Sequence, residues 1–145
     1  MSFAHLSPDE ILELHQEALE LYGGRHGLFI PEGVEAACGA VLTFCGYHPE
    51  ADILDVAAAY AFYICEEHAF NDGNKRTAAS AALTFLDGND FPIADASGPY
   101  FDERTLFAGI MGIAAHGWSR DDFAELLKSL ATKATFAGIL PKVPW

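Results

Sequence analysis

The sequence predicts an all-α fold: a compact bundle of about six helices around a buried central helix. Two observations lead to this prediction. Apolar residues recur at every third or fourth position through most of the chain, which is the period of an amphipathic helix. Residues 52–67 are apolar on nearly every side, which is typical of a helix that other helices enclose. At most one short β-hairpin flap is expected beside the helices.

The first two helices can be placed from their end signals. Ser7, Pro8 and Glu10 provide an N-cap residue, a proline suited to the first helical position and the acid of a capping box. This helix should stop at two glycines, and a second helix is expected from Pro31 to Gly46. The glycine-rich stretch between them predicts a loop or a short strand. The expected apolar stripe of the first helix consists of Ile11, Leu14, Ala18, Leu21 and Tyr22.

The third predicted helix is the buried central one, and three further helices follow it in the sequence. The central helix over residues 52–67 is followed by a polar stretch and then by an alanine-rich helix over residues 77–86. Two further amphipathic helices are expected over residues 106–117 and 119–130, because their apolar residues keep the helical spacing.

The chain has the length of one domain, and a single domain over residues 1–145 is expected. Residues 91–99 form a connector in this prediction. Residues 135–145 form a frayed tail, because no helical pattern continues there.

Composition narrows the classes of function. The formal net charge of −13 argues against direct binding of nucleic acid and of anionic membranes, which both require a basic face. The longest uncharged apolar run covers only residues 56–65, whereas a membrane span needs about 20 residues. No signal peptide is expected, and the three cysteines form no C-x-x-C pair, which favours buried free thiols in a reducing compartment. The sequence therefore predicts a cytoplasmic protein.

The stretch HAFNDGNKRTA, residues 68–78, predicts a binding site for a polyphosphate. Gly73 and Asn74 permit a turn whose successive N–H groups form a concavity. The start of a helix directly afterwards adds unpaired N–H groups and the positive end of the helix dipole. Lys75 and Arg76 add a mobile point charge and a rigid two-pronged donor at the same place.

The same stretch also carries groups that suit catalysis. Asp72 is a hard oxygen ligand that could hold Mg²⁺ beside the phosphates, and His68 can accept a proton from a hydroxyl at neutral pH. Together they predict transfer from a nucleotide to a hydroxyl, a reaction that depends mostly on positioning and charge stabilisation. Each residue alone also suits an ordinary turn with solvated cations, but their joint spacing favours catalysis. Phe70 is expected to anchor the loop in the core.

The segment from His68 to Arg76 resembles the signature loop of the Fic/Doc superfamily, H-x-F-x-D/E-G-N-G-R-x-x-R. The Doc (death-on-curing) variant carries lysine in place of the second glycine of that pattern, and Lys75 stands there in this chain. Ala79 replaces the final arginine. The resemblance therefore points to a Doc-like toxin of a type II toxin–antitoxin system and implies a Fic/Doc-like fold over most of the chain.

The resemblance implies a specific activity. The γ-phosphate of ATP would be transferred to a Ser or Thr hydroxyl of a target protein, by family precedent a threonine of elongation factor Tu. His68 would be the base and Asp72 the Mg²⁺ ligand. The phosphates would be bound by Gly73, Asn74, Lys75 and Arg76. Because no inhibitory [S/T]-x-x-x-E-[G/N] run occurs in the sequence, inhibition is expected to come from a separate antitoxin protein.

Residues 23–47 depart from the family pattern. Doc-like chains usually carry a G-L-R-D-x-G-L-L-E-S-A-like run there, and this chain reads GLFIPEGVEAA. Leu28, Phe29 and Ile30 form the candidate target-binding segment, which could pair with an extended peptide as an added strand. At least two of these three side chains are expected to pack against the core.

Three alternatives stay open at the level of sequence. The first is transfer of AMP by a Fic-like mechanism, against which Lys75 and Ala79 argue. The second is a non-catalytic module that binds a nucleotide or a partner, against which the intact His68 and Asp72 argue. The third is nucleotide binding or hydrolysis alone, with water in place of the hydroxyl.

Overall fold

The computed structural model describes residues 2–91 and 103–136 of the chain. Within these ranges, the helices are α1 (Pro8–Tyr22), α2 (Gly33–Tyr47), α3 (Ile53–Glu67), α4 (Asn74–Gly88), α6 (Glu103–Ala114) and α7 (Arg120–Phe136). The predicted all-α class is confirmed. Most of the predicted connector and of the predicted tail lies outside the described residues, although α7 extends through residues 135 and 136.

No β-hairpin forms in the part of the chain that the structure describes. The region between α1 and α2 contributes one isolated antiparallel bridge, between Leu28 and Phe70. None of the described helices is long and apolar enough to cross a membrane.

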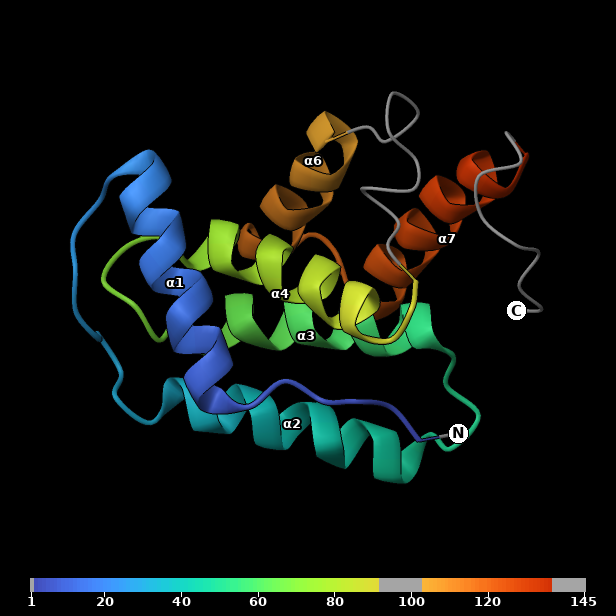
Figure 1. Ribbon diagram of the computed structural model, residues 1–145, viewed down its shortest axis with the longest axis horizontal. Helices are drawn as coiled ribbons and strands as arrows, with labels where there is room; N and C mark the ends of the chain where they lie inside the picture. Colours follow the sequence, from blue (N-terminus) through green and yellow to red (C-terminus); the bar gives the residue numbers. More distant parts are fainter. Residues whose placement is uncertain (1, 92–102, 137–145) are drawn as a thin grey trace.

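The central helix of the bundle is α3, as the sequence predicts. It packs against α2, α4, α6 and α7, and Figure 1 shows it in the middle of the molecule with α2 on one side and α6 and α7 on the other. Most of its apolar residues are buried because these helices pack around it, whereas Ile53, Phe62 and Tyr63 are partly buried. The buried residues of α3 are Leu54, Val56, Ala57, Ala58, Ala59, Tyr60, Ala61, Ile64 and Cys65.

Side-chain caps explain where α1 and α3 begin. Ser7 and Glu10 form the predicted capping box at the start of α1. Asp52 and Asp55 form a second box at the start of α3, each accepting a bond from the other's backbone N–H. The Lys128 ammonium group of α7 donates to Asp55 at 3.2 Å, which ties the last helix to the start of the central one.

The buried stripe of α1 differs from the predicted one at the end of the helix. Leu21 and Tyr22 are exposed at 75% and 58%, whereas His15 and Leu19 are buried. Leu21 lies off the stripe that starts at Ile11, because each residue turns the helix by about 100°. Tyr22 lies on that stripe but at the last position of the helix, where it reaches the rim of a pocket.

Candidate active site

The loop between α3 and α4 begins with a strained residue. His68 caps α3 in the left-handed conformation, with φ 46° and ψ 48°, and its side chain is exposed at the pocket described below. Such a backbone costs a non-glycine residue of order 1–3 kcal/mol and persists only when its surroundings impose it. Gly73, at the other end of the loop, has φ 81°, which agrees with the turn geometry predicted for this glycine.

Asn74 holds the loop closed with its side chain. Its Oδ1 accepts a bond from the Phe70 N–H at 3.1 Å, and its Nδ2 donates to the Phe70 carbonyl at 2.9 Å. The residue is buried, so both bonds are shielded from water. The first backbone bond of α4 runs from Thr77 N to Gly73 O, which leaves the N–H groups of residues 74–76 at the open start of the helix.

His15 of α1 contacts the same loop through its ring and its Nε2 atom. Its ring stacks on the buried ring of Phe70, with centroids 3.7 Å apart and planes 7° apart. Its Nε2 lies 2.8 Å from the Asp72 carbonyl, and because a carbonyl only accepts, the Nε2 proton is donated there. Sequence reasoning missed this residue, although its position four residues after Ile11 and three before Ala18 put it on the buried stripe.

Residues 24–30 run alongside the loop and are bonded to it through the backbone. The N–H groups of Phe29 and Ile30 both donate to the Ala69 carbonyl, at 2.8 and 3.0 Å. Asn71 N donates to the Gly27 carbonyl at 3.1 Å. The loop is therefore held by two parts of the chain: α1 contacts it through His15, and residues 24–30 bind it through backbone hydrogen bonds.

The candidate target-binding segment is more exposed than predicted. Leu28, Phe29 and Ile30 are exposed at 42%, 64% and 38%, so the expectation that at least two of them pack against the core was wrong. The reason is that the segment is attached to the loop through backbone hydrogen bonds, which leaves its side chains free of the core. The ring of Phe29 meets the His68 ring edge to face, with centroids 6.1 Å apart.

Asp72 presents an oriented and ionised carboxylate. Arg25 N donates to its Oδ2 at 3.2 Å and Gly73 N to its Oδ1 at 3.0 Å, and these bonds hold the pKa of the Asp72 carboxyl below its usual value. Gly24 has φ 123°, and a Cβ there would lie 2.9 Å from Asp72 Oδ2. A side chain at position 24 would thus displace the carboxylate.

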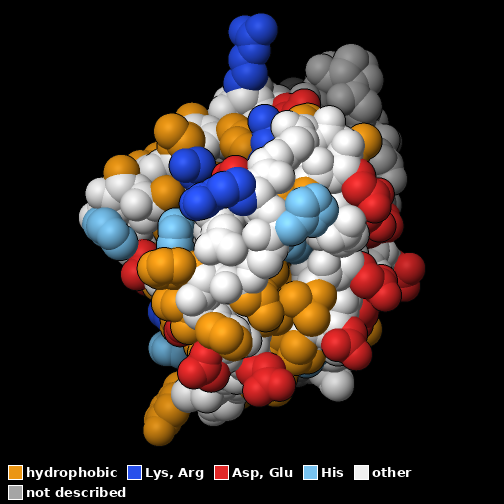
Figure 2. All heavy atoms as spheres, turned by 90° about the vertical axis from the view of Figure 1, so that its left-hand side faces the viewer, with side chains coloured by type: hydrophobic (Ala, Val, Ile, Leu, Met, Phe, Trp, Pro, Cys, Tyr) orange, Lys and Arg blue, Asp and Glu red, His pale blue; other side chains and the backbone are white. Residues whose placement is uncertain are grey.

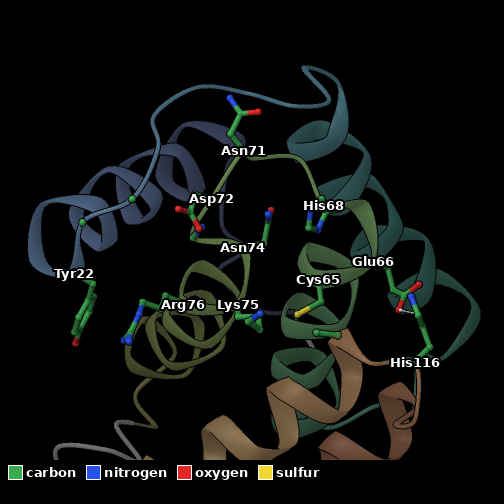
Figure 3. Close-up of a pocket in the computed structure, with 14 residues that line it drawn as sticks. Tyr22, Cys65, Glu66, His68, Asn71, Asp72, Asn74, Lys75, Arg76 and His116 are labelled. Carbon is green, nitrogen blue, oxygen red and sulfur yellow. Dashed lines mark hydrogen bonds and ion pairs between the residues drawn. The ribbon is translucent and has the colours of Figure 1, made fainter.

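The two adjacent cations point to different parts of the pocket. Figure 3 shows Lys75 directed towards Cys65 and Arg76 directed towards Tyr22. The Arg76 Cζ atom lies 3.7 Å from the centroid of the Tyr22 ring. Burial raises the pKa of the Cys65 thiol to about 12, with Glu66 adding to the shift and Lys75 opposing it. The thiol is therefore neutral at physiological pH.

These groups line one pocket of about 720 Å³ (Figure 3). Six of the predicted site residues lie together in it, namely His68, Asp72, Gly73, Asn74, Lys75 and Arg76. The candidate target-binding segment is not part of its lining. The sequence did not indicate the other lining residues, which are Tyr22, Gly23, Gly24, Cys65, Glu66, Asn71, Ala114 and His116. Asn71 lies inside the predicted stretch, and Cys65 and Glu66 directly precede it, whereas the other five come from α1, the residues after it and the region around the end of α6.

The charge distribution over this side of the molecule contrasts with the acidic chain as a whole. Figure 2 shows Lys and Arg side chains gathered in the upper part of the face with a few Asp or Glu side chains beside them, whereas most Asp and Glu side chains lie along its margins. Because the formal net charge is −13, binding of an anion requires such a local concentration of positive charge.

The donor set at Asp72 fits a magnesium ion that is bound together with phosphate. Among the described residues, no group of three or more His, Cys, Asp or Glu side chains could hold a metal ion by itself. Mg²⁺ is commonly held by only one or two carboxylates and completes its shell with water and phosphate oxygens. The two backbone bonds to Asp72 leave lone pairs on both of its oxygens for such an ion.

Fold, loop and pocket together define the class of protein. The model of the Fic/DOC family matches residues 5–86, and the chain belongs to this family, which confirms the resemblance seen in the loop. Among known proteins, the chain is similar to "Protein kinase doc" of Escherichia phage P1. The two are 38% identical over 126 residues, which cover 87% of this chain and 94% of the phage protein.

Proposed function

We propose that this protein is a Doc-like toxin that transfers the γ-phosphate of ATP to a Ser or Thr hydroxyl of a target protein. One observation carries the proposal: His68, the Asp72 carboxylate and the cationic start of α4 line the same pocket. The similarity to a phage protein named as a protein kinase supports it.

His68 acts as the base in this proposal. The ring lies at the surface of the pocket, where a hydroxyl of another protein can reach it. The imidazole accepts the proton of that hydroxyl as its oxygen attacks the γ-phosphorus, and the bond to the leaving ADP breaks. The edge-to-face contact with the Phe29 ring favours one orientation of the His68 ring before the substrate arrives.

The start of α4 binds the phosphates. The N–H groups of residues 74–76 point out of the helix end, and Lys75 and Arg76 add two full charges beside them. Magnesium, when bound at Asp72, would neutralise part of the phosphate charge. Ala79 is 5% exposed in α4, so the position of the final arginine in the Fic pattern carries a small buried side chain here. This supports transfer of the γ-phosphate over transfer of AMP.

The candidate target-binding segment lies next to the base. Leu28, Phe29 and Ile30 are exposed, and the Phe29 ring contacts the His68 ring. A peptide bound along this segment would bring a hydroxyl to His68. We propose a translation factor such as elongation factor Tu as the target and a cognate antitoxin as the inhibitor in the cytoplasm, both on the strength of the family resemblance.

Intact mass spectrometry of purified elongation factor Tu tests the proposal. The factor is incubated with ATP, Mg²⁺ and either the wild-type protein or the H68A variant, whose folding is checked by thermal unfolding. We expect the wild type to add the mass of one phosphoryl group and H68A to add none. A gain of one AMP would show the Fic-like activity instead, and an unchanged mass despite ATP binding would reject elongation factor Tu as the target.

A further inference from the structure

The guanidinium group of Arg76 lies against two aromatic rings from different helices. Its Cζ atom is 3.7 Å from the ring centroid of Tyr22 in α1 and 5.3 Å from that of Phe107 in α6. Three helices therefore meet at this one side chain. Tyr22 is 58% exposed and lines the pocket together with Arg76 (Figure 3).

This contact orients Arg76 without using its hydrogen-bond donors. A guanidinium group meets an aromatic ring with its flat face, while its five N–H donors lie in its plane and point outwards. The side chain of Arg76 makes no hydrogen bond or ion pair with any residue that the structure describes, and its contacts are those with the two rings. Its donors are thus available to an anion in the pocket.

Arg120 shows the contrasting case of a structural arginine. It also lies against a ring, with its Cζ 4.1 Å from the centroid of Phe44. However, Arg120 donates from Nη1 to the Tyr63 hydroxyl at 3.1 Å, and its Nε lies 3.8 Å from an Asp121 oxygen. An arginine that contacts a ring therefore need not have free donors. Arg76 has both the ring contact and the free donors, and it lies at the pocket.

We propose that Tyr22 is a positioning residue for Arg76: it holds the guanidinium group at the rim of the pocket with its donors free for the polyphosphate of ATP. This inference rests on the proposed function. Freezing an arginine side chain in one conformation costs rotamer entropy. Because Tyr22 restricts the side chain before ATP arrives, less of that entropy is lost on binding.

The end of α1 then positions both charged partners of the nucleotide. Tyr22 is the last residue of α1 and orients the cation of Arg76. Two glycines follow, and Arg25 N then donates to the Asp72 carboxylate. Within four consecutive residues, the chain thus contacts both the cation of Arg76 and the carboxylate of Asp72.

Calorimetric titration with ATP tests this role. We expect Y22L to bind ATP about fivefold more weakly than the wild type, and Y22F, which keeps the ring, to bind within about twofold of it. Y47L is the matched control, because Tyr47 is also an exposed tyrosine at the last position of a helix but does not line the pocket. Thermal unfolding of each variant verifies that it is folded.

A double-mutant cycle with R76A separates positioning from direct contact with the nucleotide. If Tyr22 acts through Arg76, adding Y22L to R76A should weaken ATP binding no further. An equal loss in both backgrounds would overturn the inference, as would Y22L binding as tightly as the wild type. If the wild type itself fails to bind ATP, both the proposed function and this inference fail. If the wild type binds ATP and Y22L binds it equally well, this inference alone is rejected.

Discussion

At the scale of single residues, Asn74 shows how one side chain can serve the structure of a site. The sequence predicts a role in phosphate binding for it, and the structure shows both ends of its amide bonded to the backbone of Phe70. Its side chain thus stabilises the loop that carries His68 and Asp72. The backbone N–H of Asn74, at the start of α4, remains the group that suits phosphate.

The N74A substitution should therefore lower stability as well as binding. It would leave the Phe70 N–H and carbonyl buried without partners, at a cost of about 1–3 kcal/mol for each group. Urea unfolding measures this loss. N71A is the matched control and should cost less, because the bond from Asn71 Nδ2 to the His26 carbonyl is exposed to water. A stable N74A variant that merely fails to bind ATP would contradict this account.

Residues of the motif could be predicted from the sequence because they are neighbours in the chain. Lys75, Arg76 and Asp72 belong to one short stretch whose turn and helix start can be predicted locally. His15 and Tyr22 could not be predicted as parts of the site, because their roles depend on how α1 crosses the start of α4. That crossing is a property of tertiary packing and has no local signal.

At the scale of helices, the starts of α1, α3 and α4 could be predicted from the local sequence. Ser7 and Asp52 sit at the N-caps of α1 and α3, as their side chains indicate. The alanine-rich pattern alone predicts a helix over residues 77–86, whereas the turn at Gly73 and Asn74 predicts a start near Asn74 or Lys75, and α4 begins at Asn74. Its first residues are polar and lack an apolar period, and bonds from Asn74 to Phe70 fix the helix start.

Contact between α6 and α7 depends on a glycine. A Cβ at Gly109 would lie 2.5 Å from Leu126 Cδ2 and 3.0 Å from the Phe123 ring, so G109A should overpack this interface and cost about 1–3 kcal/mol. G39A is the matched substitution in the exposed interior of α2, where a Cβ meets nothing within 4 Å. It should stabilise the protein by about 0.5–1 kcal/mol. Equal effects of the two substitutions in thermal unfolding would refute this view of the interface.

At the scale of the whole molecule, two buried groups make the free energy of unfolding fall at alkaline pH. Burial raises the pKa of the Tyr60 hydroxyl, and it raises the pKa of the Cys65 thiol to about 12 from an ordinary value of 9.0. Above pH 9 the unfolded chain therefore releases protons that the folded protein keeps, and the free energy of unfolding falls as pH rises.

Urea unfolding between pH 7 and pH 11 measures this fall. Each group can contribute up to about 1.4 kcal/mol per pH unit over the range in which only the unfolded state ionises. The C65A variant should be less stable at pH 7 because it loses buried volume, but its stability should fall less steeply above pH 9. An unchanged slope in C65A would show that the Cys65 thiol is not responsible.

The central claim is that the pocket transfers the γ-phosphate of ATP to a protein, with His68 as the base. Its most direct test incubates the purified protein with bacterial lysate and ATP that is labelled on either the γ-phosphate or the α-phosphate, with H68A as the control. We expect a protein band that carries the γ-label, lacks the α-label and disappears with H68A. A band that carries the α-label, or a γ-labelled band that persists with H68A, would contradict the claim.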